Sequence, residues 1–413
     1  MIAGGRQLRG NVVGLACACR AHHDHSMSEP ASDQRPQSTQ KPKQEPEPLS
    51  DLLTLVDRLP FVGSLRRDVT RLRALLYDRR APRVVAIGAP KSGRTQLANA
   101  LLGKEALPHA GLDAAARGER WVHINADGAR LDWTEIDVGA PAAVGAGGTE
   151  LERRRGLVEA RPDIALLVVR ADDAAALAPL VESFERLRTL LGDGGPAPRI
   201  LGVITHADVA GSERTARRRD ALEQALREHG FVDVAVLAVG TGAEPAALSE
   251  DSARGVGILA ESLVELVPDA AQLELARALP LAREGKRRIA RAIVSASSAV
   301  ALTVGLAPIP FADAVLLFPL QGVMVSSIAH VSGRPWRAGA VGEWLGSLGV
   351  VGGVGLGMRW AVQQIVKLVP GAGSMISASV AAAGTAALGH SAVAYFVDGA
   401  SLTDAKKIFG REN

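Results

Sequence analysis

Aromatic residues are scarce in this sequence and make up only 3% of its 413 positions. Such a composition suits helices that pack through small side chains. Cysteine is almost absent as well: Cys17 and Cys19 lie in an N-terminal stretch without regular periodicity. They predict neither a disulfide framework nor a zinc site, and they indicate a reducing compartment. A strong charge of one sign is also lacking, since the net charge is +3. The spread of the basic residues argues against nucleic acid as the main partner.

The N-terminal segment 1–50 is expected to be a disordered tail. From about residue 28 it is rich in Pro, Gln, Ser and Glu, a composition that cannot bury a core. Residues 2–18 have a crude signal-peptide pattern that is broken by polar residues, and both Met1 and Met27 remain open as the start. The segment 51–82 carries helical periodicity with a break at Pro60 and predicts amphipathic helices.

From residue 83 onward, patterns typical of strands and helices alternate. This alternation predicts a doubly wound α/β domain over 83–268, with a mostly parallel sheet. Strands are expected at 83–88, 120–125, 130–138, 163–170, 199–205 and 232–239. Helices are expected at 95–102, 150–160, 173–191, 212–229 and 256–266.

One hairpin narrows the fold class. Residues 121–133 read as two strands joined by Asp127-Gly128, which suits a two-residue turn. The hairpin adds one antiparallel edge strand to the sheet. Small GTPases have this arrangement, so the sequence predicts a P-loop GTPase-type sheet.

The most informative stretch follows the first strand and reads G-A-P-K-S-G-R-T. It has the spacing of a phosphate-binding loop, in which backbone N–H groups and a helix N-terminus converge on an anion. Arg94 stands where such loops carry lysine; it keeps the charge but is planar and bulkier. Thr95 is predicted to offer a hydroxyl to Mg²⁺. The expected nucleotide contacts in this loop are Gly88, Lys91, Ser92, Gly93, Arg94, Thr95 and Gln96.

An acidic residue at the end of the third strand is the second signal. Asp137 is predicted to hold the Mg²⁺ ion together with Thr95, although an aspartate that merely caps a strand end is the alternative. The following residues depart from the usual pattern, since Ala140 stands where a glycine is expected and residues 108–118 contain no Ser or Thr for Mg²⁺. These departures argue against ordinary hydrolysis.

Base recognition is expected at the end of the fifth strand. The run Thr205-His206-Ala207-Asp208 occupies the place of the N/T-K-x-D motif. The Asp208 carboxylate is predicted to accept hydrogen bonds from the N1 and N2 groups of guanine, which adenine does not offer. His206 replaces a lysine whose stem covers the base, and Thr205 completes the motif.

Over residues 83–268 the chain resembles the Era-like branch of P-loop GTPases, on the motifs G-A-P-K-S-G-R-T, I-D-V-G-A-P, I-T-H-A-D and G-V-G-I-L. Residues 283–400 resemble the YcjF-like C-terminal domain of unknown function, on P-I-P-F-A-D, L-Q-G-V-M and K-L-V-P-G-A-G. The resemblance implies a bacterial, membrane-associated protein that binds GTP or GDP with Mg²⁺. Arg94 and Ala140 depart from the family and make catalysis doubtful, so GTPase activity stays undecided.

The C-terminal part is apolar and expected to be α-helical. After a linker helix at 269–288, the segment 289–400 carries few charges, and a tail follows at 401–413. Its uncharged runs are long enough to cross a bilayer, yet they are rich in small residues and interrupted by proline. Two alternatives follow: association with the inner membrane, with the nucleotide domain in the cytoplasm, or a cytoplasmic protein whose apolar helices bind partner helices or form a homo-oligomer.

Overall fold

The computed structural model describes the greater part of the chain after residue 77. The described residues are 70, 74, 78–107, 120–126, 128–138, 154–241, 250–306, 312–333 and 372–412. The expected tail at 1–50, most of the amphipathic segment 51–82, the stretch 108–118 and Ala140 lie outside them.

The centre of the fold is a six-stranded mixed sheet with the order β2-β3-β1-β4-β5-β6. Only β2 and β3 pair antiparallel; the remaining neighbours are parallel. The prediction of a mostly parallel sheet with one antiparallel edge hairpin is therefore confirmed. The strands are β1 (Arg83–Gly88), β2 (Val122–Ala126), β3 (Ala129–Asp137), β4 (Ile164–Arg170), β5 (Arg199–Thr205) and β6 (Val236–Ala238).

The hairpin turn and the strand register position the candidate site. Gly128 has a φ of 81°, a left-handed conformation that glycine adopts without steric cost. It closes the turn between β2 and β3 at the position the sequence predicts. In the parallel pair of β1 and β3, Gly88 lies opposite Asp137. The phosphate loop and Asp137 therefore leave the sheet at the same edge.

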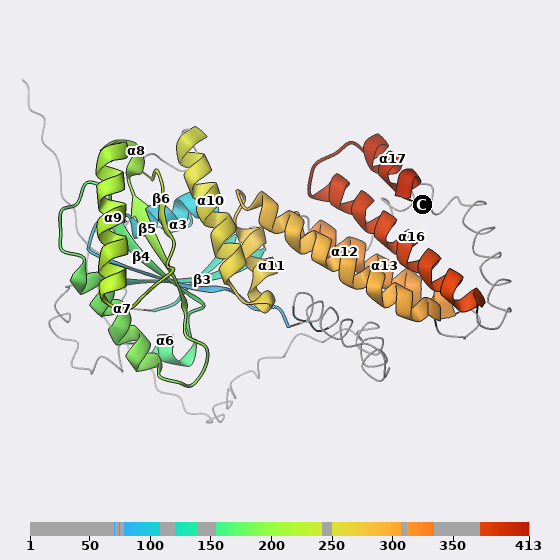
Figure 1. Ribbon diagram of the computed structural model, residues 1–413, viewed down its shortest axis with the longest axis horizontal. Coiled ribbons are helices and arrows are strands. Elements are labelled where there is room, and N and C mark those ends of the chain that lie inside the picture. The colour runs from blue at the N-terminus through green and yellow to red at the C-terminus, as the bar shows by residue number, and fades with distance from the viewer. Residues whose placement is uncertain are drawn as a thin grey trace, which may run out of the picture. The chain divides into compact units, whose positions relative to one another are not determined.

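Helices cover both faces of the sheet (Figure 1). Along β1, Val84 and Ala86 point into one core, whereas Val85 and Ile87 point into the other. This follows from the alternation of side chains along a strand. The first core is covered by α3 (Arg94–Leu102), α10 (Glu250–Leu266) and α11 (Asp269–Ala278), and the second by α6 (Arg155–Glu159), α7 (Ala178–Leu191) and α9 (Ser212–Glu228).

Several bounds differ from those expected. The strand expected at 232–239 is shorter, because Asp233 has a left-handed φ of 61° and interrupts the extended backbone before β6. The helix expected at 173–191 begins only at Ala178, with a proline in its first turn, where proline is well tolerated. The helix expected at 256–266 begins earlier, at Glu250.

The expected linker helix at 269–288 is not one helix. It is divided into α11 and the start of α12 (Arg283–Leu306), with Pro280 between them, and proline interrupts a helix because it lacks an N–H. Helix α11 also belongs to the layer on the sheet. The Arg130 backbone N–H donates to Glu274 Oε2 at 3.2 Å, and Arg277 Nη1 donates to the Gly128 carbonyl at 3.2 Å.

The C-terminal region is α-helical, as expected. It contains α12, α13 (Ala312–Val331), α16 (Ala372–Phe396) and α17 (Leu402–Glu412), and α12 packs along both α13 and α16 (Figure 1). The expected tail at 401–413 contains α17, which packs against α16 and buries Ala405. The Ser391 hydroxyl donates to the Ala405 carbonyl at 2.7 Å, so this segment is part of the helical region.

Candidate nucleotide site

The loop between β1 and α3 has the backbone of a phosphate cradle. Lys91 and Gly93 have left-handed φ angles of 65° and 86°, a geometry that turns successive N–H groups toward a common concavity. A Cβ at Gly93 would lie 2.9 Å from His206 Cε1, and one at Gly88 would lie 2.5 Å from the Val168 carbonyl oxygen. Both glycines are therefore required by close contacts. Helix α3 begins directly after Gly93, so its first N–H groups face the loop.

Arg94 does not extend into solvent. The residue is only 6% exposed, and its guanidinium lies between the ends of β1 and β3. Nη1 donates to the Gly88 carbonyl and, at 2.6 Å, to the Ile136 carbonyl, while Nη2 donates to Asp137 Oδ1. Nε is 3.6 Å from Glu135 Oε2. The side chain that replaces the usual lysine is thus bound inside the protein on the sheet side of the loop.

The two predicted Mg²⁺ ligands both have protein partners. Asp137 pairs with Arg94, and the Thr95 hydroxyl donates to Glu135 Oε1 at 2.9 Å. Trp133 Nε1 donates to the same Glu135 oxygen at 3.2 Å. Mg²⁺ requires oxygen ligands at about 2.0–2.1 Å in octahedral geometry. Asp137 already pairs with a cation, so a metal ion would have to compete with Arg94 for this carboxylate.

Within the described part of the chain, no group of three or more His, Cys, Asp or Glu side chains is placed to hold a metal ion. Glu135 had no role in the sequence analysis. The alternation of β3 provides the missing signal, because residues 133, 135 and 137 share one face of that strand, the face on which α3 packs.

The base-recognition motif lies next to the phosphate loop. The Thr205 hydroxyl donates to the Ser92 carbonyl at 2.7 Å and so connects the end of β5 to the loop. The His206 backbone N–H donates to Thr241 Oγ1 at 3.3 Å, which connects the same strand end to the segment after β6. Asp208 lies in the short helix α8 (Ala207–Ala210) and is exposed. Its Cβ would be 3.0 Å from a Cβ at Gly240.

His206 lies in surroundings that favour its neutral form. The residue is only 7% exposed, and burial lowers the pKa of His206 below its ordinary value of 6.5. The positive charge of Arg170 lowers it further, and Asp172 and Asp208 act in the opposite direction. Arg170 is fixed at the end of β4 by Asp172, with two contacts of 2.9 and 2.8 Å. The hydrogen bonds from Arg170 lower the pKa of Asp172 to about 2.

The predicted residues thus converge on one edge of the sheet. Gly88, the loop 91–96 and Asp137 meet at the ends of β1 and β3, and the motif 205–208 joins them from β5. This is the edge at which open α/β sheets bind ligands. Sequence reasoning missed Glu135 and Arg170, which contact predicted residues from neighbouring segments.

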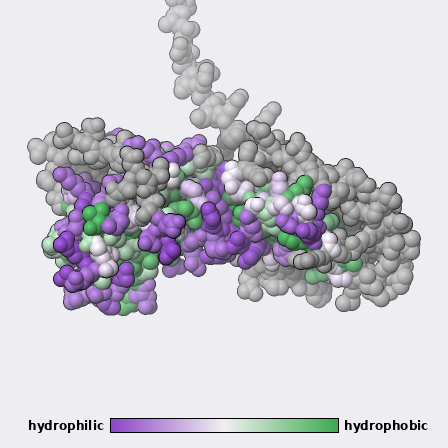
Figure 2. All heavy atoms as spheres, turned by 90° about the horizontal axis from the view of Figure 1, so that it is seen from above, coloured by the Kyte–Doolittle hydropathy of each residue, from purple (hydrophilic) through white to green (hydrophobic). Residues whose placement is uncertain are grey.

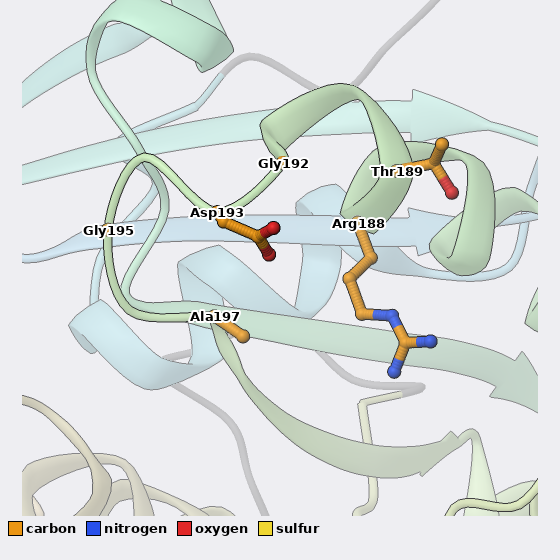
Figure 3. A pocket seen from close by; sticks show the side chains of 6 residues that line it. All are labelled: Arg188, Thr189, Gly192, Asp193, Gly195 and Ala197. Atoms are coloured by element: carbon orange, nitrogen blue, oxygen red, sulfur yellow. The ribbon is translucent and has the colours of Figure 1, made fainter.

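A separate cavity of about 520 Å³ lies at the opposite end of the strands, between the end of α7 and the start of β5 (Figure 3). Its lining includes Arg188, Gly195 and Ala197. Arg161 spans this region by donating to the carbonyls of Leu191, Gly192 and Gly195. None of the predicted site residues lines this cavity.

Part of this chain resembles several solved protein structures. No family model matches the chain, and no curated protein matches it. Solved structures that resemble it include Era in complex with MgGDPNP and 16S ribosomal RNA nucleotides (15% identity, 46% of this chain and 58% of that one, TM-score 0.32). Aquifex aeolicus Era bound to GDP·AlF4⁻ shares 17% identity over 52% of this chain and 65% of that one, with a TM-score of 0.32. A GTP-binding protein from Sulfolobus solfataricus in complex with GDP shares 18% identity over 46% of this chain and 59% of that one, with a TM-score of 0.27.

The ligand and activity of this chain have to be inferred from its own residues. The chain spans 58–65% of the length of those three proteins. Identities and TM-scores of this size carry no conclusion about ligand or activity. The sheet order and the antiparallel edge hairpin remain the basis of the P-loop GTPase-type fold.

Proposed function

We propose that this chain is a guanine-nucleotide-binding protein of the Era-like P-loop class, with weak or lost GTP hydrolysis. One observation carries the proposal: the phosphate loop and the base-recognition motif form a single bonded unit. The Thr205 hydroxyl reaches the Ser92 carbonyl, and His206 packs against Gly93. A nucleotide whose phosphates lie on the loop therefore has its base near the segment that carries Asp208.

Guanine is the base that this segment suits. Asp208 is an exposed carboxylate in the short helix α8 that follows β5, and a carboxylate accepts two N–H donors at once. The loop at Gly240 and Thr241 packs beside it and is held to His206. A site built to pair with two donors rejects a base that lacks them, because its acceptor is left without a partner. We infer that GTP and GDP bind in preference to ATP.

We expect weak hydrolysis because the side chains of Arg94 and Thr95 are bonded to other protein groups. Fast phosphoryl transfer in P-loop proteins uses a lysine on the β and γ phosphates and a metal ion on the same oxygens. Here the equivalent side chain, Arg94, is bonded to Asp137 and to two carbonyls. Thr95 is bonded to Glu135. We expect turnover far below the enzyme median of about 10 per second.

An Asp208→Asn substitution tests base recognition. Because the amide presents a donor where the carboxylate presented an acceptor, affinity for GDP should fall at least about tenfold and affinity for xanthosine diphosphate should rise. Asp193→Asn is the matched control, since Asp193 is an exposed aspartate on the cavity at the opposite end of the strands. Fluorescent nucleotide titrations measure both variants. Equal affinity of the unchanged chain for ATP and GTP contradicts the proposal.

We further propose that the helical region associates with a bacterial inner membrane, with the nucleotide domain in the cytoplasm. Among the described residues, one helix segment, Arg283–Gly305, is long and apolar enough to cross a membrane, and 56% of its most apolar window is buried in the protein. Leu302 on α12 is 42% exposed and Phe318 on α13 is 63% exposed. These two side chains leave apolar surface for a lipid or protein contact.

The alternative is a non-hydrolysing scaffold that binds partner helices or oligomerises through the same region. Its supporting observation is close helix packing: a Cβ at Gly305 would lie 2.5 Å from Ala378 Cα, and one at Gly389 would lie 2.6 Å from Val294 Cγ2. Small residues permit such contact in water and in lipid. The surface view shows only small, separate hydrophobic patches among the coloured residues (Figure 2). Carbonate washing of cell membranes separates the proposals, because a soluble oligomer supports the scaffold and retention in the pellet supports the membrane.

A further inference from the structure

We infer that Arg94 serves as the built-in cation of the phosphate loop, and that the site takes guanine nucleotide without Mg²⁺. This inference rests on the proposed function, because it concerns the same site. It departs from the expectation that Thr95 and Asp137 hold a metal ion.

The first step is the position of the charge. A guanidinium carries a permanent positive charge and five N–H donors in a fixed planar fork. In Arg94 this fork joins the end of β1, through the Gly88 carbonyl, to the end of β3, through the Ile136 carbonyl and Asp137. The charge therefore lies directly behind the loop, between the two strands that flank it. Burial to 6% exposure fixes it there.

The second step concerns the oxygen atoms that a metal ion needs. Asp137 Oδ1 accepts from Arg94, and Thr95 Oγ1 uses its proton on Glu135. Glu135 is oriented in turn by Trp133 Nε1 and lies 3.6 Å from Arg94 Nε. The predicted ligands thus belong to a cluster that is already connected through side chains. A metal ion at Asp137 would therefore compete with the guanidinium of Arg94 for the same carboxylate.

The third step is the charge of the cluster. The guanidinium of Arg94 faces two carboxylates, Glu135 and Asp137, so it already neutralises part of the negative charge that would attract a metal ion. A divalent ion at Asp137 would lie beside the guanidinium of Arg94, and like charges at short distance repel. Arg94 therefore neutralises the carboxylates at the end of β3 in place of a metal ion. The loop N–H groups and the α3 N-terminus remain to bind phosphate.

Titration of the full chain with fluorescent methylanthraniloyl-GDP tests the inference, once in EDTA and once in excess Mg²⁺. We expect the two dissociation constants to agree within about twofold, because the coupling between metal and nucleotide is absent. Thermal unfolding of the nucleotide-free chain with Mg²⁺ alone gives a second reading that needs no variant. Its midpoint should not move.

Arg94→Lys is the informative variant. A single ammonium does not span two carbonyls and a carboxylate as the fork does, so Asp137 becomes available to a metal ion. In this variant Mg²⁺ should tighten GDP binding by about tenfold or more. Arg161→Lys is the matched control, because Arg161 also holds backbone carbonyls but lies at the other end of the strands. It should leave the metal dependence unchanged.

Each outcome has one meaning. Equal affinities in EDTA and Mg²⁺, with metal dependence gained by Arg94→Lys, support the inference. Tenfold tighter binding of the unchanged chain in Mg²⁺, or a raised unfolding midpoint in Mg²⁺ alone, overturns the inference and leaves the proposed function standing. Absence of GDP binding in both buffers overturns the proposed function and the inference together.

Discussion

Alanine at Gly389 probes the packing of α16 on α12. A Cβ at this position would lie 2.6 Å and 2.7 Å from the two Cγ atoms of Val294 and 3.1 Å from its Cβ. Val294 is 1% exposed, and a β-branched side chain in a helix has one strongly preferred rotamer. The valine therefore has no room to turn away. Either the valine or one of the helices must shift.

The magnitude follows from a comparison with Gly384 on the same helix, where an added Cβ meets nothing within 4 Å. Glycine to alanine in a helix interior gains about 1 kcal/mol, so Gly384→Ala should raise the free energy of unfolding by that amount. The same gain applies at Gly389, but overpacking costs about 1–3 kcal/mol. The two variants should therefore differ by about 1–3 kcal/mol, with Gly389→Ala the less stable.

Urea denaturation followed by far-UV circular dichroism measures both variants against the unchanged chain. Val294→Ala removes the atoms that the new Cβ would meet, and it should by itself cost roughly 2 kcal/mol through the cavity it leaves. In the double variant Val294→Ala with Gly389→Ala, the two changes should compensate by about 1 kcal/mol or more. Equal stability of Gly384→Ala and Gly389→Ala, or strict additivity in the double variant, would refute the close helix contact.

Two further predictions concern the nucleotide site. Thr205→Val removes the 2.7 Å hydrogen bond to the Ser92 carbonyl, so it should lower the free energy of unfolding by about 1 kcal/mol and weaken GDP binding. Thr134→Val is the control, because the buried Thr134 hydroxyl has no hydrogen-bond partner. An equal loss of stability in Thr134→Val would contradict the reasoning. The NMR titration midpoint of His206 should lie below 6.5 and rise in Arg170→Gln. Because the fold favours the neutral imidazole, this contribution to stability is fully present above pH 6.5 and is lost as the pH falls through the lowered pKa; a midpoint above 6.5 would be evidence against the buried position.

Local patterns were sufficient for most of the sheet. The alternation of strand and helix patterns predicted the mostly parallel sheet, and the turn at Gly128 predicted its antiparallel edge hairpin. Boundaries were less accurate where one residue changes the backbone, as at Asp233, where a left-handed φ shortens β6. The segment 269–288 also differed, because Pro280 separates α11 from α12.

The phosphate loop shows the division between sequence and tertiary structure most clearly. By itself the sequence determined the loop's glycine spacing, the acid at the end of β3 and the motif that carries Asp208, since each is written in consecutive residues. Only the tertiary structure decided what Arg94 does. Its partners Gly88, Glu135, Ile136 and Asp137 come from two strand ends that are distant in the chain. A guanidinium binds whichever acceptors the packing of β1 against β3 brings within reach, and no local pattern records that choice.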